Sequence, residues 1–399
     1  PPQQSFHISQ LIYDTRYRST TIQVVAFILI MSGIWWLGNN VVTNLSARGK
    51  DFDFGFLGSR AGYDINQMLV PYSNDSTHAM AALVGILNTL LVAFLGCITA
   101  TVIGVTAGVL RLSKNWIVGR LMTVYVEGFR NIPLLLWIIV IFAVMTESTP
   151  APREFRGEDA EASMILWDSF AITNRGIFMP SPQWGANSGL LVAIFLASIV
   201  GIFFYRAMAR KKQEQTGEQS PVFLVSLGLF FLPVIVAYFI LGRPVSLNYP
   251  ELGGFNFTGG LQLRNSLIAL WIALSLYTGA FIAEIVRAGI LAVNKGQTEA
   301  SSALGMRSSW TMNLVVLPQA LRVIIPPLIS QYLNLTKNSS LAIAVGYMDV
   351  RATLGGITIN QTGRELEGML LLGLFYLITS LVISGGMNIY NNSVKLQER

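Results

Sequence analysis

Residues 80–110 read MAALVGILNTLLVAFLGCITATVIGVTAGVL and contain no charged side chain. A membrane-spanning helix needs about 20 mostly apolar residues, so this stretch can cross a bilayer even when it is tilted. It therefore predicts a transmembrane helix.

The composition of the whole chain agrees with a membrane protein. Hydrophobic residues make up 52% of the 399 residues, and charged residues make up only 12%. A water-soluble domain has roughly twice that share of charge. Because the polar material cannot cover a globule of this size, we expect lipid to surround most of the surface.

Seven other stretches are similarly long and apolar. The predicted spans are roughly residues 20–37, 80–110, 121–145, 189–207, 221–241, 265–291, 314–335 and 367–388. The first span lies too far from the N-terminus to be a cleaved signal, so we expect it to be retained. The predicted fold class is an all-α integral membrane protein with about eight transmembrane helices.

The loops between the predicted spans differ in charge. With the N-terminus inside, the inner loops carry many more Lys and Arg than acids, whereas the outer loops carry a small excess of acids. Positive residues favour the cytoplasmic side of a membrane. We therefore predict that both termini are cytoplasmic, and the net charge of +6 requires no nucleic-acid partner.

Motifs of common enzymes are absent from the sequence. It contains no phosphate-binding G-x-x-x-x-G-K-[ST] loop, no G-x-S-x-G elbow, no H-E-x-x-H and no Asp-rich calcium loop. The single cysteine, Cys97, and two distant histidines, His7 and His78, argue against a disulfide framework or a metal centre. We expect no catalytic residue, metal or cofactor on this chain.

Residues 277–341 carry the strongest functional signal. Helix-forming residues 297–304 lie between two glycines, Gly296 and Gly305, and two predicted spans flank them. Gly305 suits the left-handed residue that ends a helix. We expect a short amphipathic helix on the cytoplasmic side, with Glu299 exposed.

The spacing here resembles the EAA loop of ABC importer permeases, which runs E-A-A, three residues, G, nine residues, I, one residue, L-P. This chain keeps every gap, with Glu299-Ala300-Ser301, Gly305, Val315 and Leu317-Pro318. Ser301 stands for the third-position Ala and Val315 stands for Ile. Both differences are small and leave the spacing intact.

Flanking motifs resemble those of polar amino-acid permeases. They are FIAEIVRAGI at 281–290, PQALR at 318–322, Pro326-Pro327, KNSSL at 337–341, Asn88-Thr89 and EGFRNIPLL at 127–135. The resemblance covers about half of the chain, roughly residues 84–145 and 260–395. In its length the chain is similar to permeases of the general L-amino acid type.

The resemblance implies a type I ABC importer permease core in two parts, residues 80–145 and 261–399. Residues 1–79 would hold the N-terminal segment, the first span and an outer loop. Residues 146–260 would form an insertion with a periplasmic loop and two extra spans. The outer loops are either docking surfaces for a binding protein or spacers.

Such a permease would be one subunit of a bacterial inner-membrane complex that imports L-amino acids. The implied partners are a second, homologous permease subunit, two ATPase subunits that bind ATP and Mg, a periplasmic amino-acid-binding protein and membrane lipid. The implied ATPase-coupling residues are Thr298, Glu299, Ala300, Ser301, Gly305, Met306, Arg307 and Pro318. The alternative is an ordinary polar turn, but the spacing and the flanking motifs favour coupling.

Two E-x-x-R pairs, Glu127 with Arg130 and Glu284 with Arg287, lie near cytoplasmic ends of predicted spans. Residues three apart share a helix face. The pairs either form an inner gate or substrate contact, or they are interfacial ion pairs whose arginines reach lipid headgroups. For Glu284 both interpretations stay open.

Asn334, Lys337, Asn338 and Ser340 end the proline-rich seventh span. Lys and Asn are suitable donors for the carboxylate of a zwitterionic amino acid. Alternatively, these residues cap the span at the outer interface. Two rival functions are an ion-coupled secondary amino-acid transporter and a membrane-embedded enzyme, which would need a convergent His, Asp and Glu cluster.

Overall fold

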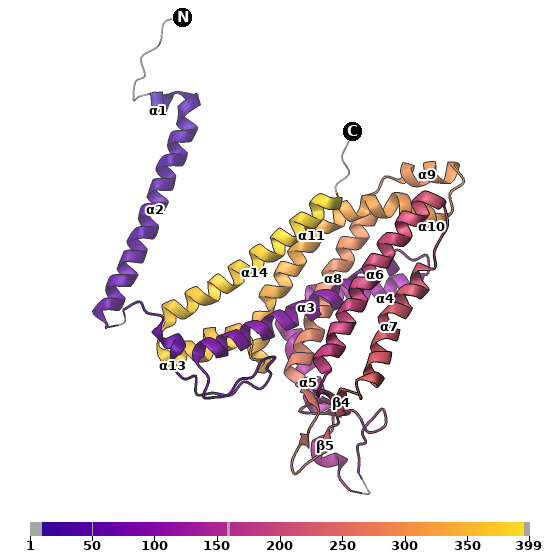
Figure 1. The fold of residues 1–399 in the computed structure, drawn as a ribbon. Coiled ribbons are helices and arrows are strands. Elements are labelled where there is room, and N and C mark those ends of the chain that lie inside the picture. The colour runs from indigo at the N-terminus through magenta and orange to yellow at the C-terminus, as the bar shows by residue number, and fades with distance from the viewer. Residues whose placement is uncertain (1–9, 50, 158–159, 395–399) are drawn as a thin grey trace, which may run out of the picture. The chain divides into compact units, whose positions relative to one another are not determined.

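The computed structural model describes residues 10–49, 51–157 and 160–394, and most of them are helical (Figure 1). Within these ranges, 8 helical segments are long and apolar enough to cross a membrane, which confirms the predicted number. Their bounds are Tyr17–Ala47, His78–Leu110, Leu134–Phe155, Ser188–Thr216, Val222–Ile240, Asn265–Leu291, Ser308–Val345 and Glu365–Asn391.

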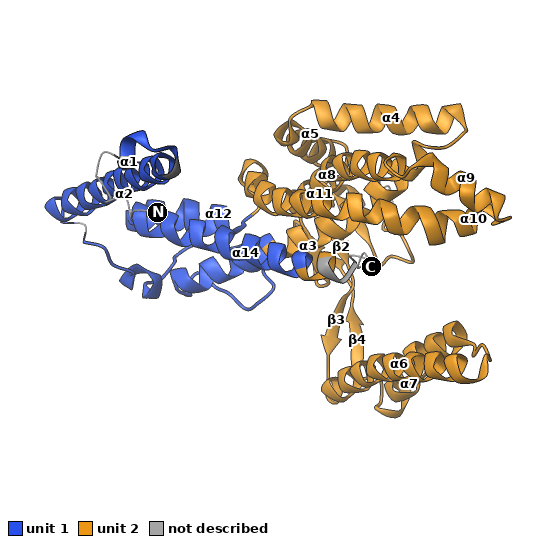
Figure 2. Ribbon diagram, turned by 90° about the horizontal axis from the view of Figure 1, so that it is seen from above, with its two compact units in different colours: residues 1–89, 348–388 blue, residues 90–347, 389–399 orange. Residues whose placement is uncertain are grey.

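The chain forms two compact units (Figure 2). The first comprises residues 1–89 and 348–388, and the second comprises residues 90–347 and 389–399. Helix α3 (His78–Leu110) contributes residues to both units.

The first unit contains the N-terminal helices and the last span. Its elements are α1 (Gln10–Tyr13), α2 (Thr15–Ala47), the start of α3, α12 (Val350–Ala352), α13 (Ile359–Thr362) and α14 (Glu365–Val394), which extends past the unit's end. Small apolar residues of α3 and α14 form its core with α12, including Ala82, Val350 and Leu372. By contrast, the most apolar 18-residue stretch of α2 has no buried residue, as expected for a helix surrounded by lipid.

The second unit is organised around α8 (Asn265–Leu291). In its most apolar 18-residue stretch, 72% of the residues are buried. Three helices pack against it: α4 (Trp116–Asn131), α5 (Leu134–Glu147) and α11 (Leu317–Asn338). A central helix that is covered on several sides needs apolar residues around its whole circumference. Accordingly, α8 supplies much of the main hydrophobic core.

Two glycines let α3 approach α8 closely. A Cβ atom at Gly104 would lie 2.5 Å from Cβ of Ile282, and one at Gly108 would lie 2.6 Å from the carbonyl oxygen of Ala283. Small residues four apart on a helix are typical of such close contacts in membranes. No larger residue fits at either position without a shift of the backbone.

The single span predicted over residues 121–145 is wrong. The chain instead forms α4 and α5, separated at Ile132 and Pro133. Proline lacks an N–H group and drives the preceding residue into extended backbone, and Ile132 has φ −106° and ψ 135°. Only the α5 side of this break, Leu134–Phe155, is apolar enough to cross a membrane.

Short strands, which the all-α prediction did not include, occur between residues 171 and 263. They are β1 (Ala171–Thr173), β2 (Gly176–Met179), β3 (Ser181–Trp184), β4 (Val245–Asn248), β5 (Glu251–Leu252), β6 (Phe257–Thr258) and β7 (Leu261–Leu263). They pair antiparallel as β1-β2-β7, β3-β4 and β5-β6. The β3-β4 ribbon carries the helical hairpin of α6 (Ser188–Thr216) and α7 (Val222–Ile240) at its end (Figure 2).

Candidate functional site

A short helix, α9 (Lys295–Ala303), follows α8 after a three-residue link (Figure 1). Its N-terminus is capped by Asn294, whose side-chain oxygen accepts a hydrogen bond from the Gly296 N–H at 2.8 Å. Asparagine at this position satisfies one of the N–H groups that the first turn leaves without a helical partner. The sequence thus starts this helix at a defined residue.

The C-terminus of α9 is fixed by Gly305, which has φ +72°. The Gly305 N–H donates to the Ser302 carbonyl at 3.0 Å, and the Met306 N–H donates to the Ser301 carbonyl at 3.1 Å. This pair of bonds is the Schellman motif, which requires a left-handed residue, normally glycine. The short helix is therefore stopped at both ends by specific hydrogen bonds.

The predicted coupling residues differ in exposure. Thr298, Glu299 and Ala300 are exposed, whereas Ser301 is buried and its hydroxyl donates to the Gln297 carbonyl at 2.7 Å. The hydroxyl that distinguishes Ser301 from the family's alanine is thus satisfied within the helix. Of the remaining coupling residues, Gly305, Arg307 and Pro318 are exposed, and Met306 is half-buried.

A cavity of about 310 Å³ lies under one side of α9. Thr298 and Ser302 of α9 line it together with Thr311 and Val316 of the following segment. Glu299 and Ala300 are not among its lining residues. Both residues are exposed, so they are accessible to another protein.

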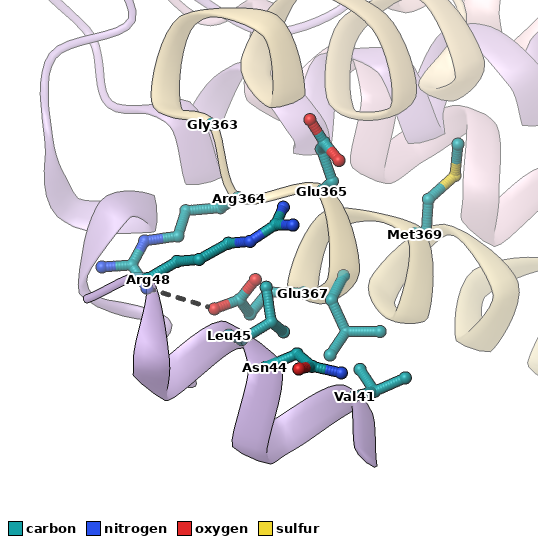
Figure 3. A pocket seen from close by; sticks show the side chains of 10 residues that line it. Val41, Asn44, Leu45, Arg48, Gly363, Arg364, Glu365, Glu367 and Met369 are labelled. Atoms are coloured by element: carbon teal, nitrogen blue, oxygen red, sulfur yellow. Dashed lines mark hydrogen bonds and ion pairs between the residues drawn. The ribbon is translucent and has the colours of Figure 1, made fainter. Parts of the chain in front are cut away.

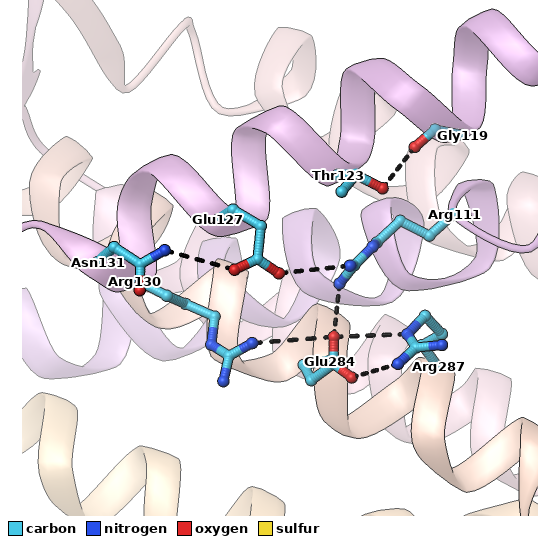
Figure 4. Close-up of polar contacts among 8 residues, drawn as sticks. All are labelled: Arg111, Gly119, Thr123, Glu127, Arg130, Asn131, Glu284 and Arg287. Atoms are coloured by element: carbon cyan, nitrogen blue, oxygen red, sulfur yellow. Dashed lines mark hydrogen bonds and ion pairs between the residues drawn. The ribbon is translucent and has the colours of Figure 1, made fainter.

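A second polar cluster joins three helices of the second unit (Figure 4). Arg111, the first residue after α3, donates to Glu284 of α8 at 2.5 Å and lies 3.6 Å from Glu127 of α4. Arg287 pairs with Glu284 at 2.6 Å, and Arg130 lies 3.9 Å from the same carboxylate. Three arginines thus surround two glutamates.

The cluster confirms one of the two predicted E-x-x-R pairs. Glu284 pairs with Arg287 on its own helix, but the ion pairs of the described residues include none between Glu127 and Arg130. Glu127 contacts Arg111 instead, and Arg130 faces Glu284 and the ring of Phe281. Arg111 and Arg130 thus contact carboxylates of neighbouring helices, whereas Arg287 pairs within α8.

Arg111 is a functional candidate that the sequence patterns do not single out, because it belongs to no motif and is one of many Lys and Arg residues in the inner loops. Its side chain is 9% exposed, against 26% for Glu284 and 50% for Glu127. Removing one partner of a largely buried charge is destabilising, because the charge is then left less well compensated. The only signal in the sequence was its position directly after a charge-free span, and this signal did not indicate its partners.

The predicted substrate residues lie at the end of α11 and in the adjoining 3-10 turn (Ser339–Val345). Asn334 and Lys337 are exposed and three residues apart, whereas Asn338 and Ser340 are half-buried. A cation in the last turn of a helix also interacts favourably with the carbonyls at that end. The geometry is compatible with both a capping role and a substrate contact, and each stays a prediction.

The first unit contains a larger pocket, of about 580 Å³, between the end of α2 and the start of α14 (Figure 3). Within it, Arg364 and Glu367 pair at 3.3 Å. Glu367 also accepts the Asp53 N–H at 3.1 Å, and Arg364 donates to the Asp51 carbonyl. These charges hold residues 51–53 against α14. Among the described residues, no group of three or more His, Cys, Asp or Glu could hold a metal ion.

Comparison with known proteins identifies the family. The model of the binding-protein-dependent transport system inner membrane component matches residues 219–396. Three curated permeases match almost throughout. The glutamate/glutamine/aspartate/asparagine transport system permease protein BztB of Rhodobacter capsulatus is 54% identical over 100% of this chain and 99% of its own length. The general L-amino acid transport system permease protein AapQ of Rhizobium johnstonii is 44% identical, over 97% of this chain and 95% of its own. The putative amino-acid ABC transporter permease protein YhdX of Escherichia coli is 41% identical, over 96% and 95% respectively.

These matches confirm the resemblance that the motifs indicated. The chain belongs to the binding-protein-dependent transport system inner membrane components, as a multi-pass permease of the amino-acid ABC transporter type.

Proposed function

We propose that this chain imports L-amino acids across the bacterial inner membrane and that α9 is the helix through which a separate ATPase drives it. The observation that carries this proposal is the geometry of α9. It is a nine-residue helix, capped at both ends, and its Glu299 and Ala300 are exposed and do not line the cavity beside it. A rigid, exposed helix between two spans can be displaced as a unit when another subunit that contacts it moves.

The mechanism follows from where α9 is attached. Because three residues join α9 to α8, a displacement of α9 acts directly on the most buried helix of the second unit. Exposed Glu299 would pair with a cation on the ATPase, and Gly305 would turn the chain back toward α11. ATP and Mg would bind to the ATPase, and this chain would perform no covalent step.

The complex would contain a second, homologous permease subunit, two ATPase subunits and a periplasmic amino-acid-binding protein, with both termini of this chain in the cytoplasm. The names of relatives support amino acids as the substrates. Among the predicted substrate positions, Asn334 and Lys337 could donate to the carboxylate of an amino acid, whereas Glu284 could bind only its ammonium group. Asn334 and Lys337 are exposed, whereas both oxygens of Glu284 face arginines.

The contacts of Glu284 with arginines also argue against an ion-coupled secondary transporter. A proton-coupled transporter typically uses intramembrane carboxylates that take up and release the proton during the cycle. In this cluster the two glutamates already contact guanidinium groups.

The proposal can be tested by amino-acid uptake into proteoliposomes that contain the complete complex. We expect uptake to require ATP and to fall at least about tenfold in Glu299→Lys, as when an interaction of about 1.4 kcal/mol or more is lost. Glu214→Lys is the matched control, because it reverses an exposed charge in the last turns of α6. Uptake that follows an ion gradient without ATP would contradict the proposal.

A further inference from the structure

We propose that Arg111 is a positioning residue that holds the ends of α3, α4 and α8 together, so that these three helices move as one body when α9 is displaced. The proposal rests on the coupling role given above to α9. It assigns the Arg111 cluster to transmission of the movement, and it makes no claim on substrate binding.

The cluster lies on the path that a movement of α9 must take. Glu284 precedes the end of α8 at Leu291 by about two helical turns. Helix α9 begins three residues after that end. A displacement of α9 therefore reaches α8 first, and Glu284 is the point at which α8 contacts the other two helices through charges.

Arg111 connects both of those helices to α8. One of its terminal nitrogens donates to Glu284 at 2.5 Å, and the other lies 3.6 Å from Glu127 on α4. Arg287 cannot replace it, because Arg287 belongs to the same helix as Glu284. Arg130 also joins α4 to α8, at 3.9 Å from Glu284, but it lies on α4 and does not connect α3. Among the residues drawn in Figure 4, Arg111 alone contacts both glutamates.

Burial and side-chain geometry make this connection specific. Exposed ion pairs contribute little, but the Arg111 side chain is 9% exposed. The planar guanidinium presents several donors in fixed directions, so it can bridge two carboxylates, whereas the ammonium of lysine acts as a point charge. The bridge therefore requires arginine and not only a positive charge.

An apolar layer directly beside the cluster joins the same three helices. Ala107 of α3, Val126 of α4, and Ala280 and Ala283 of α8 are buried together. Gly108 allows the close approach of α3 and α8 at this level. The apolar layer sets the distances between the helices, and the Arg111 bridge closes the layer at the end nearest α9.

The experiment measures uptake and ATP hydrolysis together in proteoliposomes that contain the complete complex. We expect Arg111→Ala to assemble and hydrolyse ATP but to transport at least about fivefold fewer amino acids per ATP than wild type, the lower end of ordinary coupling effects. For Arg111→Lys we expect a ratio of transported amino acids to hydrolysed ATP between those of wild type and Arg111→Ala, since lysine keeps the charge and loses the bridge. Arg210→Ala is the matched control, because it removes an exposed ion pair on α6 and should leave the ratio unchanged.

The outcomes separate this inference from the proposed function. A wild-type ratio in Arg111→Ala overturns the positioning role and leaves the import function intact. Absence of ATP-driven uptake in wild type overturns the import function, and the positioning role with it. If Arg111→Ala does not assemble, Arg111→Lys keeps the positive charge and loses the two-carboxylate bridge, and a wild-type ratio in that variant overturns the role of Arg111.

Discussion

At the start of α12, Asp349 is a fully buried carboxyl group. One of its oxygens accepts the Ala352 N–H at 2.9 Å and caps the helix, while the other is buried without a hydrogen-bond partner among the described residues. Burial raises the pKa of Asp349 from 3.8 to about 7, and the backbone hydrogen bond opposes this only in part. The folded chain therefore favours the protonated form below about pH 7.

The sign of the resulting pH dependence follows from linkage. Because the pKa of Asp349 is higher in the folded state, its ionisation lowers stability between about pH 4 and pH 7, by at most about 1.4 kcal/mol per pH unit, and the penalty is constant above that range. Asp349→Asn keeps a capping oxygen and cannot ionise. In detergent, we expect the Tm of the variant to exceed that of wild type by an amount that grows from pH 5 to pH 7. A difference in Tm that does not change with pH would show that Asp349 stays ionised in the fold.

Individual residues differ in how far the sequence could predict them. Gly305 was predictable, because a left-handed helix end leaves glycine as the favoured residue and the local spacing shows where the helix stops. Arg111 was not, because its partners lie on helices 16 and 173 residues away along the chain. Its role depends on packing that no local pattern encodes.

At the scale of elements, the contact between α3 and α8 depends on glycine. A Cβ atom at Gly108 would meet the Ala283 carbonyl oxygen at 2.6 Å and the Val286 side chain at 2.9 Å. We expect Gly108→Val to lower the free energy of unfolding by about 1–3 kcal/mol through overpacking, seen as a lower Tm in detergent. Gly33→Val in α2 is the control, because nothing lies within 4 Å of its Cβ position. Equal Tm values for the two variants would mean that α3 and α8 are not in close contact.

Elements were predictable where apolarity alone defines them. Long apolar runs predict α3, α8 and α14 because lipid forces such stretches to satisfy their own backbone as helices. The break before α5 was missed although Pro133 was visible, because prolines are tolerated inside membrane helices, as Pro233 is in α7. The strands at residues 171–263 are two to four residues long, too short for a periodic pattern.

At the scale of the whole molecule, we propose that one short helix, α9, connects the membrane-spanning helices to an ATPase subunit. Sequence patterns alone predicted the family, the number of spans and the position of this helix. The arrangement of α3, α4 and α8 around Arg111 is visible only in the structure.

The central claim, that α9 transmits the work of an ATPase, is tested most directly by changing how the helix ends. Gly305 and Gly217 have nearly equal φ angles, +72° and +73°, follow the C-termini of α9 and α6, and have nothing within 4 Å of their Cβ positions. Valine is strained at both positions, since a β-branched residue rarely adopts positive φ. In proteoliposomes with the complete complex, we expect Gly305→Val to reduce ATP-driven uptake at least about tenfold, which corresponds to about 1.4 kcal/mol, and Gly217→Val to leave uptake unchanged. Equal uptake by the two variants would contradict the account.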